Sequence, residues 1–488
     1  MELGRSYGLL LHPSSLPGPW GIGDFGSAAY EFLDFLKETG GNIWQILPLG
    51  PTGFGESPYQ GLSAFGINPV LISVDSLRER GLLDRSDGAD MPLFPVGMVD
   101  FDKVQSVKAP LFQKAFDRFM LNQDASVTAE YEAFAERAGD WLEEYALYAA
   151  LKDFFKGAPW IEWEQDLARR RIYALRRYRK QVQMGVRYHS FLQYIAWSQW
   201  NDIKRYAGER HIRIVGDMPI YMAWDSADVW ANQQYFDLDA DGRPRTVAGV
   251  PPDYFSETGQ LWGNPLYRWD RMERDGYDWW RKRIQNMLSL TDYVRIDHFR
   301  AFEDFWEIPA GERTAVNGRW VKGPGLPFFR TLEERLGTLP LIAEDLGIIT
   351  PEVTALREAC GYPGMKVYQF VSSEPVVRGD ETVQRVAYPG THDNDTLAGW
   401  IYENLFPAVL SRSFDFWAFQ QEFLELIMDS RDAWVVLPVQ DILGLSTEAR
   451  MNRPGVLGGN WRWRLKSADQ WAERKEWLAK TARDTRRC

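Results

Sequence analysis

The chain has 488 residues, and its 56 basic and 68 acidic side chains give a net charge of −12. Nucleic acids and anionic membranes both bind to basic faces, so this balance argues against either as a partner. No apolar run of about 18 residues occurs, so the sequence predicts no membrane span. The two cysteines, Cys360 and Cys488, exclude a disulfide framework and suit a reducing cytoplasm.

The aromatic content is high, with 22 Trp, 21 Tyr and 27 Phe residues. Sugar rings have apolar C–H faces that pack on aromatic rings, so an enzyme that acts on carbohydrates is one explanation. A large aromatic core is the other explanation, and composition alone favours it.

The first two predicted strands are short and apolar, at residues 8–12 and 43–47. Between them, residues 21–26 match the dinucleotide-binding pattern G-x-G-x-x-G and precede a predicted helix, for which Ser27 is the expected cap. The context argues against nucleotide binding. The glycines do not follow the first strand directly, and the second strand ends in Pro48, where a ribose-binding acid would stand.

Residues 49–207 are predicted to form an insertion after the second strand. It begins with a long loop at residues 50–60 that is rich in turn-forming residues. From about residue 105 to residue 207 the apolar residues recur at helical spacing, and no strand–helix alternation is visible. We therefore expect a largely helical subdomain that packs on the main body.

Strand–helix alternation resumes after the insertion. A helix between two of the later strands has clear end signals, with Thr350 as its cap, Pro351 in its first turn and Gly361 after its last turn. Together with the two N-terminal strands, the expected total is eight strands separated by helical segments, which predicts a (β/α)8 barrel. The later strands are predicted near residues 212–217, 293–297, 339–344, 365–370, 386–391 and 434–437.

Four of the predicted strands lead into acidic residues, namely Asp217, Asp297, Glu344 and Asp393. In a parallel barrel all strands end on one face, so these acids should converge although they are far apart in sequence. A single acid at a strand end is usually a loop cap. Four together, with Arg295 beside them, predict a catalytic carboxylate cluster.

Two of these acids stand in contrasting surroundings. Arg295 is two positions before Asp297, so both side chains should point to one face, where the guanidinium should lower the pKa of a nucleophilic carboxylate. Glu344 follows an apolar run at residues 341–343, and desolvation there should raise its pKa, as a proton donor requires. Such a pair suits glycoside chemistry. A metal site is the main rival, but the acids lack a second histidine at ligand spacing, and Arg295 would occupy the place of the cation.

At these residues the chain resembles the 4-α-glucanotransferases, also called amylomaltases or disproportionating enzymes, within the wider α-amylase clan. The resemblance covers nearly the full length. It rests on Ser57-Pro58-Tyr59-Gln60, Gly216-Asp217-Met218-Pro219-Ile220-Tyr221, Asp225-Ser226-Ala227-Asp228-Val229-Trp230, the segment from Val247 to Ser256, the segment from Gly259 to Tyr267, Arg295-Ile296-Asp297-His298, Ala343-Glu344-Asp345-Leu346-Gly347 and Gly390-Thr391-His392-Asp393-Asn394-Asp395-Thr396.

The resemblance implies a retaining double displacement, with an α-1,4-glucan as donor and a sugar as acceptor. Asp297 matches the nucleophile, Glu344 the acid/base, and Asp393 the acid that holds the ring hydroxyls of the distorted sugar. Similar enzymes need neither an organic cofactor nor an essential metal ion. The other matches are Tyr59, Asp217, Arg295 and His392 around the sugar under attack, Trp262 at the acceptor sugar, and Asn460 near the donor sugars.

The resemblance also implies an insertion at residues 225–285, which includes a lid over the cleft at residues 247–267. Residues 439–488 are expected to form a C-terminal loop and helix, too short for the β-sandwich that usually follows an α-amylase barrel. The whole chain is thus predicted to be a single catalytic unit.

Two alternatives remain open. Water and a sugar 4-hydroxyl can intercept the same glycosyl-enzyme, so an α-1,4-glucan hydrolase is the nearer alternative. A lid that excludes water, built from Pro251, Pro252 and Trp262, favours transfer. A non-catalytic glucan-binding barrel is the other alternative, and the presence of all three carboxylates argues against it.

Overall fold

The computed structural model describes all residues except 1, 122–124, 253–255, 372–375, 379–380 and 405–414. Its central element is a parallel sheet of eight strands in the order β10-β11-β12-β1-β2-β3-β6-β9. The first and last strands meet where the N–H of Ala343 donates to the carbonyl oxygen of Pro363 at 2.9 Å, so the sheet closes into a barrel. The predicted (β/α)8 fold is confirmed. The strands are β1 (Ser6–Leu10), β2 (Ile43–Gln45), β3 (Arg213–Met218), β6 (Tyr293–Ile296), β9 (Leu341–Ala343), β10 (Gly364–Val367), β11 (Val383–Tyr388) and β12 (Asp432–Pro438).

Side-chain alternation gives each strand an inner and an outer face. In β12, Trp434 packs in the cluster inside the barrel, whereas its neighbour Val435 packs in the cluster between the barrel and the outer helices. In β6, Val294 likewise packs outward, and the next residue, Arg295, is buried inside the barrel. Side chains two positions apart point to the same face, so Asp297, two positions after Arg295, also faces the inside of the barrel, at its mouth.

The backbone ladder continues past the ends of two strands. The N–H of Asp297 donates to the carbonyl oxygen of Met218 at 3.0 Å, and the N–H of Glu344 donates to that of Ile296 at 3.1 Å. Both acids are therefore held at the carboxyl end of the barrel by hydrogen bonds of the sheet itself.

Helices cover the outside of the barrel. In α13 (Pro351–Cys360) the Thr350 side chain accepts a hydrogen bond from the N–H of Val353, and Gly361 ends the helix with a φ of 69°, as the sequence predicts. The other helices around the barrel are α1 (Ser27–Glu38), α11 (Asp278–Leu290), α12 (Gly325–Leu336), α14 (Leu397–Asn404), α15 (Phe416–Met428) and α16 (Val439–Ile442).

The predicted cap of α1 is wrong by one residue. Gly26 is the N-cap, and Ser27 is already helical. The N–H of Gly26 donates to Oδ1 of Asp24 at 3.0 Å, and a Cβ at Gly26 would stand 2.8 Å from oxygens of Asp24 and Ser73. The close approach of these two side chains selects glycine at the cap.

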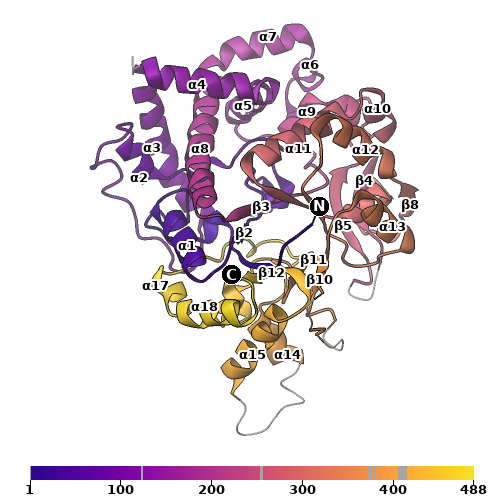
Figure 1. Cartoon of the computed structure of the whole chain (residues 1–488). Coiled ribbons are helices and arrows are strands. Elements are labelled where there is room, and N and C mark those ends of the chain that lie inside the picture. The colour runs from indigo at the N-terminus through magenta and orange to yellow at the C-terminus, as the bar shows by residue number, and fades with distance from the viewer. Residues whose placement is uncertain (1, 122–124, 253–255, 372–375, 379–380, 405–414) are drawn as a thin grey trace.

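The first insertion is helical and lies on one side of the barrel, in violet to magenta in Figure 1. Its longest helix, α8, leads back into β3, and Trp200 on α8 is buried and donates to the carbonyl oxygen of Leu290 at 2.9 Å. The insertion is therefore packed on the barrel and not a separate body. Its helices are α2 (Val74–Glu79), α3 (Phe101–Leu121), α4 (Ala125–Ala138), α5 (Asp140–Phe154), α6 (Gln165–Ala168), α7 (Ile172–Gln181) and α8 (Gln183–Glu209).

A second sheet, which was not predicted from the sequence, combines two strands of the region predicted as insertion and lid with two strands that follow β6 in the chain. This antiparallel sheet has the order β5-β4-β7-β8. Gly249 permits the tight pairing of β4 and β5, because a Cβ there would meet the carbonyl oxygen of Gln260 at 2.2 Å. Residues 253–255 of the predicted lid lie outside the described residues. The predicted insertion contains α9 (Ala227–Ala231), β4 (Thr246–Val250), β5 (Gln260–Pro265) and α10 (Trp269–Arg274), whereas β7 (Asp304–Pro309) and β8 (Arg319–Lys322) follow β6.

The C-terminal segment packs against the start of the barrel through α17 (Asp469–Ala472) and α18 (Lys475–Asp484). Arg487 is fully buried, and its Nη1 donates to the carbonyl oxygens of Ser6 at 2.9 Å and Ala433 at 3.1 Å. These bonds tie the segment to β1 and β12. No described helix has both the length and the apolar character needed to cross a bilayer.

Candidate active site

Arg295 joins two carboxylates at the mouth of the barrel. β3 and β6 pair in a register that sets Asp217 opposite Arg295. Nη1 of Arg295 donates to the two oxygens of Asp217 at 2.8 and 2.7 Å, and Nη2 donates to Oδ1 of Asp297 at 2.9 Å. The Asp217 side chain is fully buried, whereas that of Asp297 is 29% exposed. The guanidinium is thus shared between a buried acid and one that can reach a ligand.

The pKa of Asp297 differs from the sequence expectation. Burial raises it from 3.8 to about 6; Arg295 and His392 oppose this rise, and the charges of Asp217 and Asp393 add to it. The predicted lowering of this pKa is therefore wrong. A guanidinium that is already paired with Asp217 does not outweigh the loss of hydration at Asp297.

Glu344 is held by backbone donors. Its Oε2 accepts from the N–H of His298 at 2.7 Å, and its Oε1 accepts from the N–H of Leu346 at 2.9 Å. Burial raises the pKa of Glu344 from 4.5 to about 7, against the lowering effect of Arg295. Desolvation thus acts on Glu344 as predicted. Between these two pKa values Asp297 is ionised and Glu344 protonated, which is the charge distribution that a nucleophile and a proton donor need.

Asp393 and His392 lie in the loop after β11, beyond the strand end at which the sequence analysis expected the acid. The Asp393 side chain is 43% exposed, and its Oδ1 is 3.4 Å from Nε2 of His392. The His392 ring stacks on Tyr59 with centroids 5.0 Å apart and planes at 15°. The hydroxyl of Tyr59 donates to Oδ2 of Asp217 at 2.7 Å, so an aromatic pair connects the two acids.

Trp262 stands on β5 beside the acid/base candidate. Its indole N–H donates to Oε1 of Gln260 at 3.1 Å. Its ring is edge-on to that of His298, with centroids 4.9 Å apart and planes at 87°. Because the N–H of His298 is bonded to Glu344, Trp262 lies on the side of the site where that carboxyl acts.

An open cleft of about 560 Å³ runs across the barrel mouth. Asp217 and Arg295 are buried and do not line it, and Glu344 does not line it either but is bonded to the N–H of His298, the residue after the cleft-lining Asp297. Among the described residues, no group of three or more His, Cys, Asp or Glu side chains is placed to hold a metal ion. The predicted site residues that line the cleft are Tyr59, Trp262, Asp297, His392, Asp393 and Asn460.

Asn460 uses its side chain to shape the cleft wall. Its Oδ1 accepts from the N–H of Arg453 at 3.0 Å, and its Nδ2 donates to the carbonyl oxygens of Arg453 at 3.3 Å and Val456 at 2.9 Å. The amide thus closes the loop at residues 453–458, which lines the cleft.

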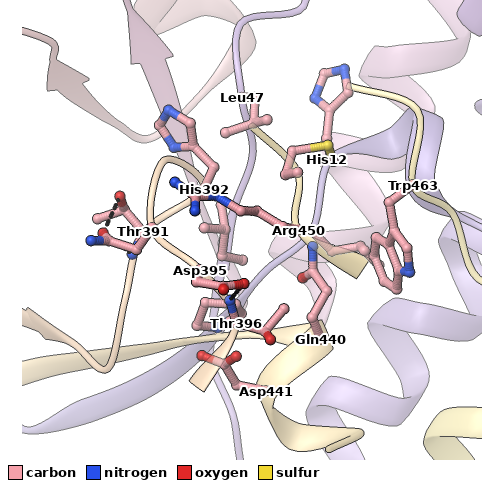
Figure 2. Close-up of a pocket in the computed structure, with 15 residues that line it drawn as sticks. His12, Leu47, Thr391, His392, Asp395, Thr396, Gln440, Asp441, Arg450 and Trp463 are labelled. Carbon is pink, nitrogen blue, oxygen red and sulfur yellow. Dashed lines mark hydrogen bonds between the residues drawn. The ribbon is translucent and has the colours of Figure 1, made fainter. Parts of the chain in front are cut away.

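A second, much smaller cavity of about 20 Å³ shares His392 with the cleft (Figure 2). Arg450 crosses it, and the buried Asp441 and His12 border it. A cavity of this size has room for about one water molecule.

Three groups that complete the site were not predicted from the sequence. Trp461 packs against both Tyr59 and His392, with centroids at 5.5 and 5.9 Å. Asn452 and Arg450 bond to Asp393. No pattern within a single segment marks these contacts, because each joins residues that are distant in sequence.

Known proteins resemble this chain over almost its whole length. The family model described as 4-alpha-glucanotransferase matches residues 11–470. The 4-alpha-glucanotransferase of Thermus thermophilus is 49% identical over 482 residues, with 95% of each chain covered. That of Synechocystis sp. is 46% identical over 479 residues, with 94% of each chain covered. A solved amylomaltase from Streptococcus agalactiae in complex with acarbose superposes with a TM-score of 0.92, at 37% identity and 99% coverage of both chains.

Proposed function

Because the chain belongs to the 4-alpha-glucanotransferase family and transfers segments of α-1,4-glucans to acceptor sugars, we propose that Asp297, Glu344 and Asp393 carry out this transfer as a retaining double displacement. One observation carries the assignment: the N–H of His298, the residue after Asp297, donates to the Glu344 carboxylate at 2.7 Å. Retaining enzymes place their two carboxyl groups about 5–5.5 Å apart, and a link through one neighbouring residue suits that spacing.

In the first step, the Asp297 carboxylate attacks the anomeric carbon of the sugar at the cleavage point. Glu344 gives its proton to the glycosidic oxygen, and the reducing-end part of the donor leaves with a new 4-hydroxyl. The remaining glucan is bound to Asp297 as an ester, with inverted configuration. The higher pKa of Glu344 supplies the proton where Asp297 is already ionised.

In the second step, the Glu344 carboxylate removes the proton from the 4-hydroxyl of an acceptor sugar. The acceptor oxygen attacks the anomeric carbon, the bond to Asp297 breaks, and an α-1,4 linkage forms. Asp297 is again a carboxylate and Glu344 a carboxylic acid. Two inversions give net retention without a redox step or an external proton source, so the side chains suffice and no organic cofactor is required.

The remaining assignments concern the sugar under attack. Asp393 is exposed enough to accept hydrogen bonds from ring hydroxyls, and such bonds strengthen as the ring distorts. Tyr59 and His392 form an aromatic surface beside it. Asp217 and Arg295 act from beneath by holding the Tyr59 hydroxyl and Asp297. Asn460 supports the wall on which donor sugars lie.

Transfer is favoured over hydrolysis by the position of Trp262. This half-buried indole lies against His298, where an acceptor sugar has to approach Glu344. A ring there offers stacking to a sugar and covers apolar space that water would otherwise occupy. The hydrolase alternative would need an unshielded path for water to Glu344.

The cellular setting is also part of the proposal. The net charge of −12 argues against nucleic acid as a partner. Cys360 and Cys488 are both free thiols, as a reducing cytoplasm would keep them. We assign the protein to the cytoplasm, with glucan and sugar as its partners.

Incubation with maltotriose tests the proposed function. Transfer should give glucose and a ladder of longer maltodextrins while the total number of reducing ends stays constant. A rise in reducing ends without longer products would establish a hydrolase instead.

Asp297→Asn tests the nucleophile and the non-catalytic alternative together. The variant should bind acarbose but lose several orders of magnitude in turnover of maltotriose. Near-normal turnover would contradict the nucleophile assignment, whereas a wild-type protein that binds maltotriose without turning it over would identify a binding protein.

A further inference from the structure

Among the three proposed catalytic acids, Asp393 is the one whose backbone N–H is bonded within its own loop, to Oγ1 of Thr391 at 3.3 Å, and not to a neighbouring strand. β11 ends at Tyr388, and Asp393 lies in the loop beyond it with a side chain that is 43% exposed. The backbone N–H groups of Asp297 and Glu344 are instead bonded to neighbouring strands at 3.0 and 3.1 Å. A carboxylate that has to meet particular sugar hydroxyls must be held in place, so other groups have to orient Asp393.

Asn452 bonds to this loop in two places. Its Nδ2 donates to Oδ1 of Asp393 at 2.6 Å, and its backbone N–H donates to the carbonyl oxygen of His392 at 3.1 Å. In the part of the chain that the structure describes, no protein donor is bonded to Oδ2 of Asp393, and this oxygen is therefore available to a sugar hydroxyl.

Arg450 also connects the loop of Asp393 with the segment of Asn452. Its Nη2 donates to the carbonyl oxygen of Asp393 at 2.6 Å, and its Nε donates to the carbonyl oxygen of Asn452 at 2.7 Å. Figure 2 shows its side chain extending across the small cavity towards His392. Charged donors to backbone oxygens are stronger than neutral ones, so Arg450 fixes both segments relative to each other.

The same segment continues into the wall of the cleft. Directly after Asn452, residues 453–458 line the cleft, and the Asn460 amide closes that loop. The segment that bonds to Asp393 therefore also forms the wall against which a glucan would lie.

We propose that Asn452 and Arg450 are positioning residues for glucan transfer, which orient Asp393 so that its Oδ2 meets the hydroxyls of the distorted sugar. This inference rests on the proposed function, since it takes Asp393 as the acid that holds that sugar. This positioning role is distinct from a direct contact between Asn452 and the sugar, and from a role of Asn452 in folding alone.

The test is a double-mutant cycle read by calorimetric titration with acarbose, a ligand with a flattened ring that resembles the distorted sugar. The variants are Asn452→Ala, Asp393→Ala and the double variant. Asn452→Ala should weaken acarbose binding by about 10–100-fold, because a misplaced carboxylate loses most of its bonds. The double variant should bind no more weakly than Asp393→Ala, because Asn452 has nothing left to orient.

Asn317→Ala is the matched control. It also removes a hydrogen bond from an amide to a carboxylate, Nδ2 to Oε2 of Glu312 at 3.2 Å, but on an exposed turn. Acarbose affinity should not change in this variant. In maltotriose turnover, Asn452→Ala should lower kcat by about 10–100-fold with little change in KM, since the bonds to Asp393 matter most in the transition state.

The outcomes separate the possible roles. Wild-type affinity in Asn452→Ala would overturn the inference. So would equal losses in both backgrounds, which would mean a direct sugar contact or a structural role. Wild-type affinity in Asp393→Ala would instead contradict the function proposed for Asp393.

Two further variants keep the test valid if Asn452→Ala folds poorly. Asn452→Asp keeps the shape but sets a carboxylate against Asp393, so it should lose more kcat than Asn452→Ala. A packing role predicts the reverse order. Arg450→Lys keeps the charge but replaces the two fixed donors, Nε and Nη2, with a single nitrogen on a flexible stem, and it should show the same loss of kcat at nearly constant KM.

Discussion

The backbone N–H of His298 donates to Oε2 of Glu344 at 2.7 Å, so the residue that follows the proposed nucleophile holds the proposed acid/base. The backbone at the end of β6 therefore carries Asp297 and also holds Glu344. Their separation is therefore set by the pairing of β6 with β9 and not by side-chain rotamers alone. Both groups share the same desolvated surroundings, and the pKa of each is raised.

The activity should have a narrow optimum between the two raised pKa values. Below pH 6, Asp297, with a pKa of about 6, takes up a proton and no longer acts as a nucleophile. Above pH 7, Glu344, with a pKa of about 7, loses the proton that the leaving oxygen needs. The expected result is a bell-shaped profile of kcat/KM. Because Asp297 and Glu344 interact, the apparent pKa values of its two limbs belong to the two groups together. Maltotriose kinetics from about pH 4.5 to about pH 9 measure it. A flat profile over that range would contradict these assignments.

Glu344→Gln should remove the basic limb of this profile. Glutamine does not titrate, so activity should fall by about 10²–10⁴-fold at the optimum and should not decline further as the pH rises. The acid limb, which belongs to Asp297, should remain. Fluoride leaves without help from a proton, so α-maltosyl fluoride should restore much of the first step. An unchanged basic limb in the variant would exclude Glu344 as the proton donor.

Local patterns suffice to predict the barrel and the strand ends at which Asp217, Asp297 and Glu344 lie. Alternation in β6 sets Arg295 and Asp297 on the inner face, and the cap and glycine signals of α13 predict its ends. These features depend on a few neighbouring residues and on the general geometry of parallel barrels. The eight strands could therefore be predicted without any knowledge of their contacts.

The remaining features depend on contacts between distant segments. Asn452 and Asp393 are 59 positions apart, and nothing in either segment indicates the other. The pKa of Asp297 is a balance between burial and several charges, so the adjacent Arg295 alone gave the wrong direction. The antiparallel sheet escaped prediction because β4 and β5 contain glycine, which weakens strand signals, and because β4 pairs with β7, a strand that lies beyond β6 in the chain.

Asp441→Asn should stabilise the fold at alkaline pH. Asp441 is 1% exposed; its Oδ1 accepts from the N–H of Leu397 at 2.7 Å, while its Oδ2 has no hydrogen-bond partner among the described residues. Burial raises its pKa from 3.8 to about 7, and the charge of Asp395 adds to this rise.

The pKa of Asp441 is higher in the folded than in the unfolded state. Its contribution to the free energy of unfolding is therefore fully present below about pH 4 and is lost as the pH rises to about 7. That loss amounts to about 4 kcal/mol, which the neutral asparagine avoids. The variant should melt several degrees above the wild type at about pH 8, and the difference should shrink towards about pH 5. Thermal unfolding at both pH values measures it, with the exposed Asp117→Asn as the control. A difference that does not depend on pH would show that ionisation of Asp441 is not the cause.

Trp262→Ala should shift the reaction from transfer towards hydrolysis. The indole lies edge-on to His298 at 4.9 Å, where an acceptor sugar must approach Glu344. Its removal takes away a stacking surface worth about 0.5–1.5 kcal/mol and opens space for water beside the glycosyl-enzyme. The KM for a sugar acceptor should rise by about 2–10-fold, and reducing ends should accumulate during incubation with maltotriose. Trp320→Ala, on the outer strand of the same antiparallel sheet, is the control, because Trp320 does not line the cleft. If Trp262→Ala kept both the wild-type acceptor KM and a constant number of reducing ends, Trp262 would neither bind the acceptor nor exclude water.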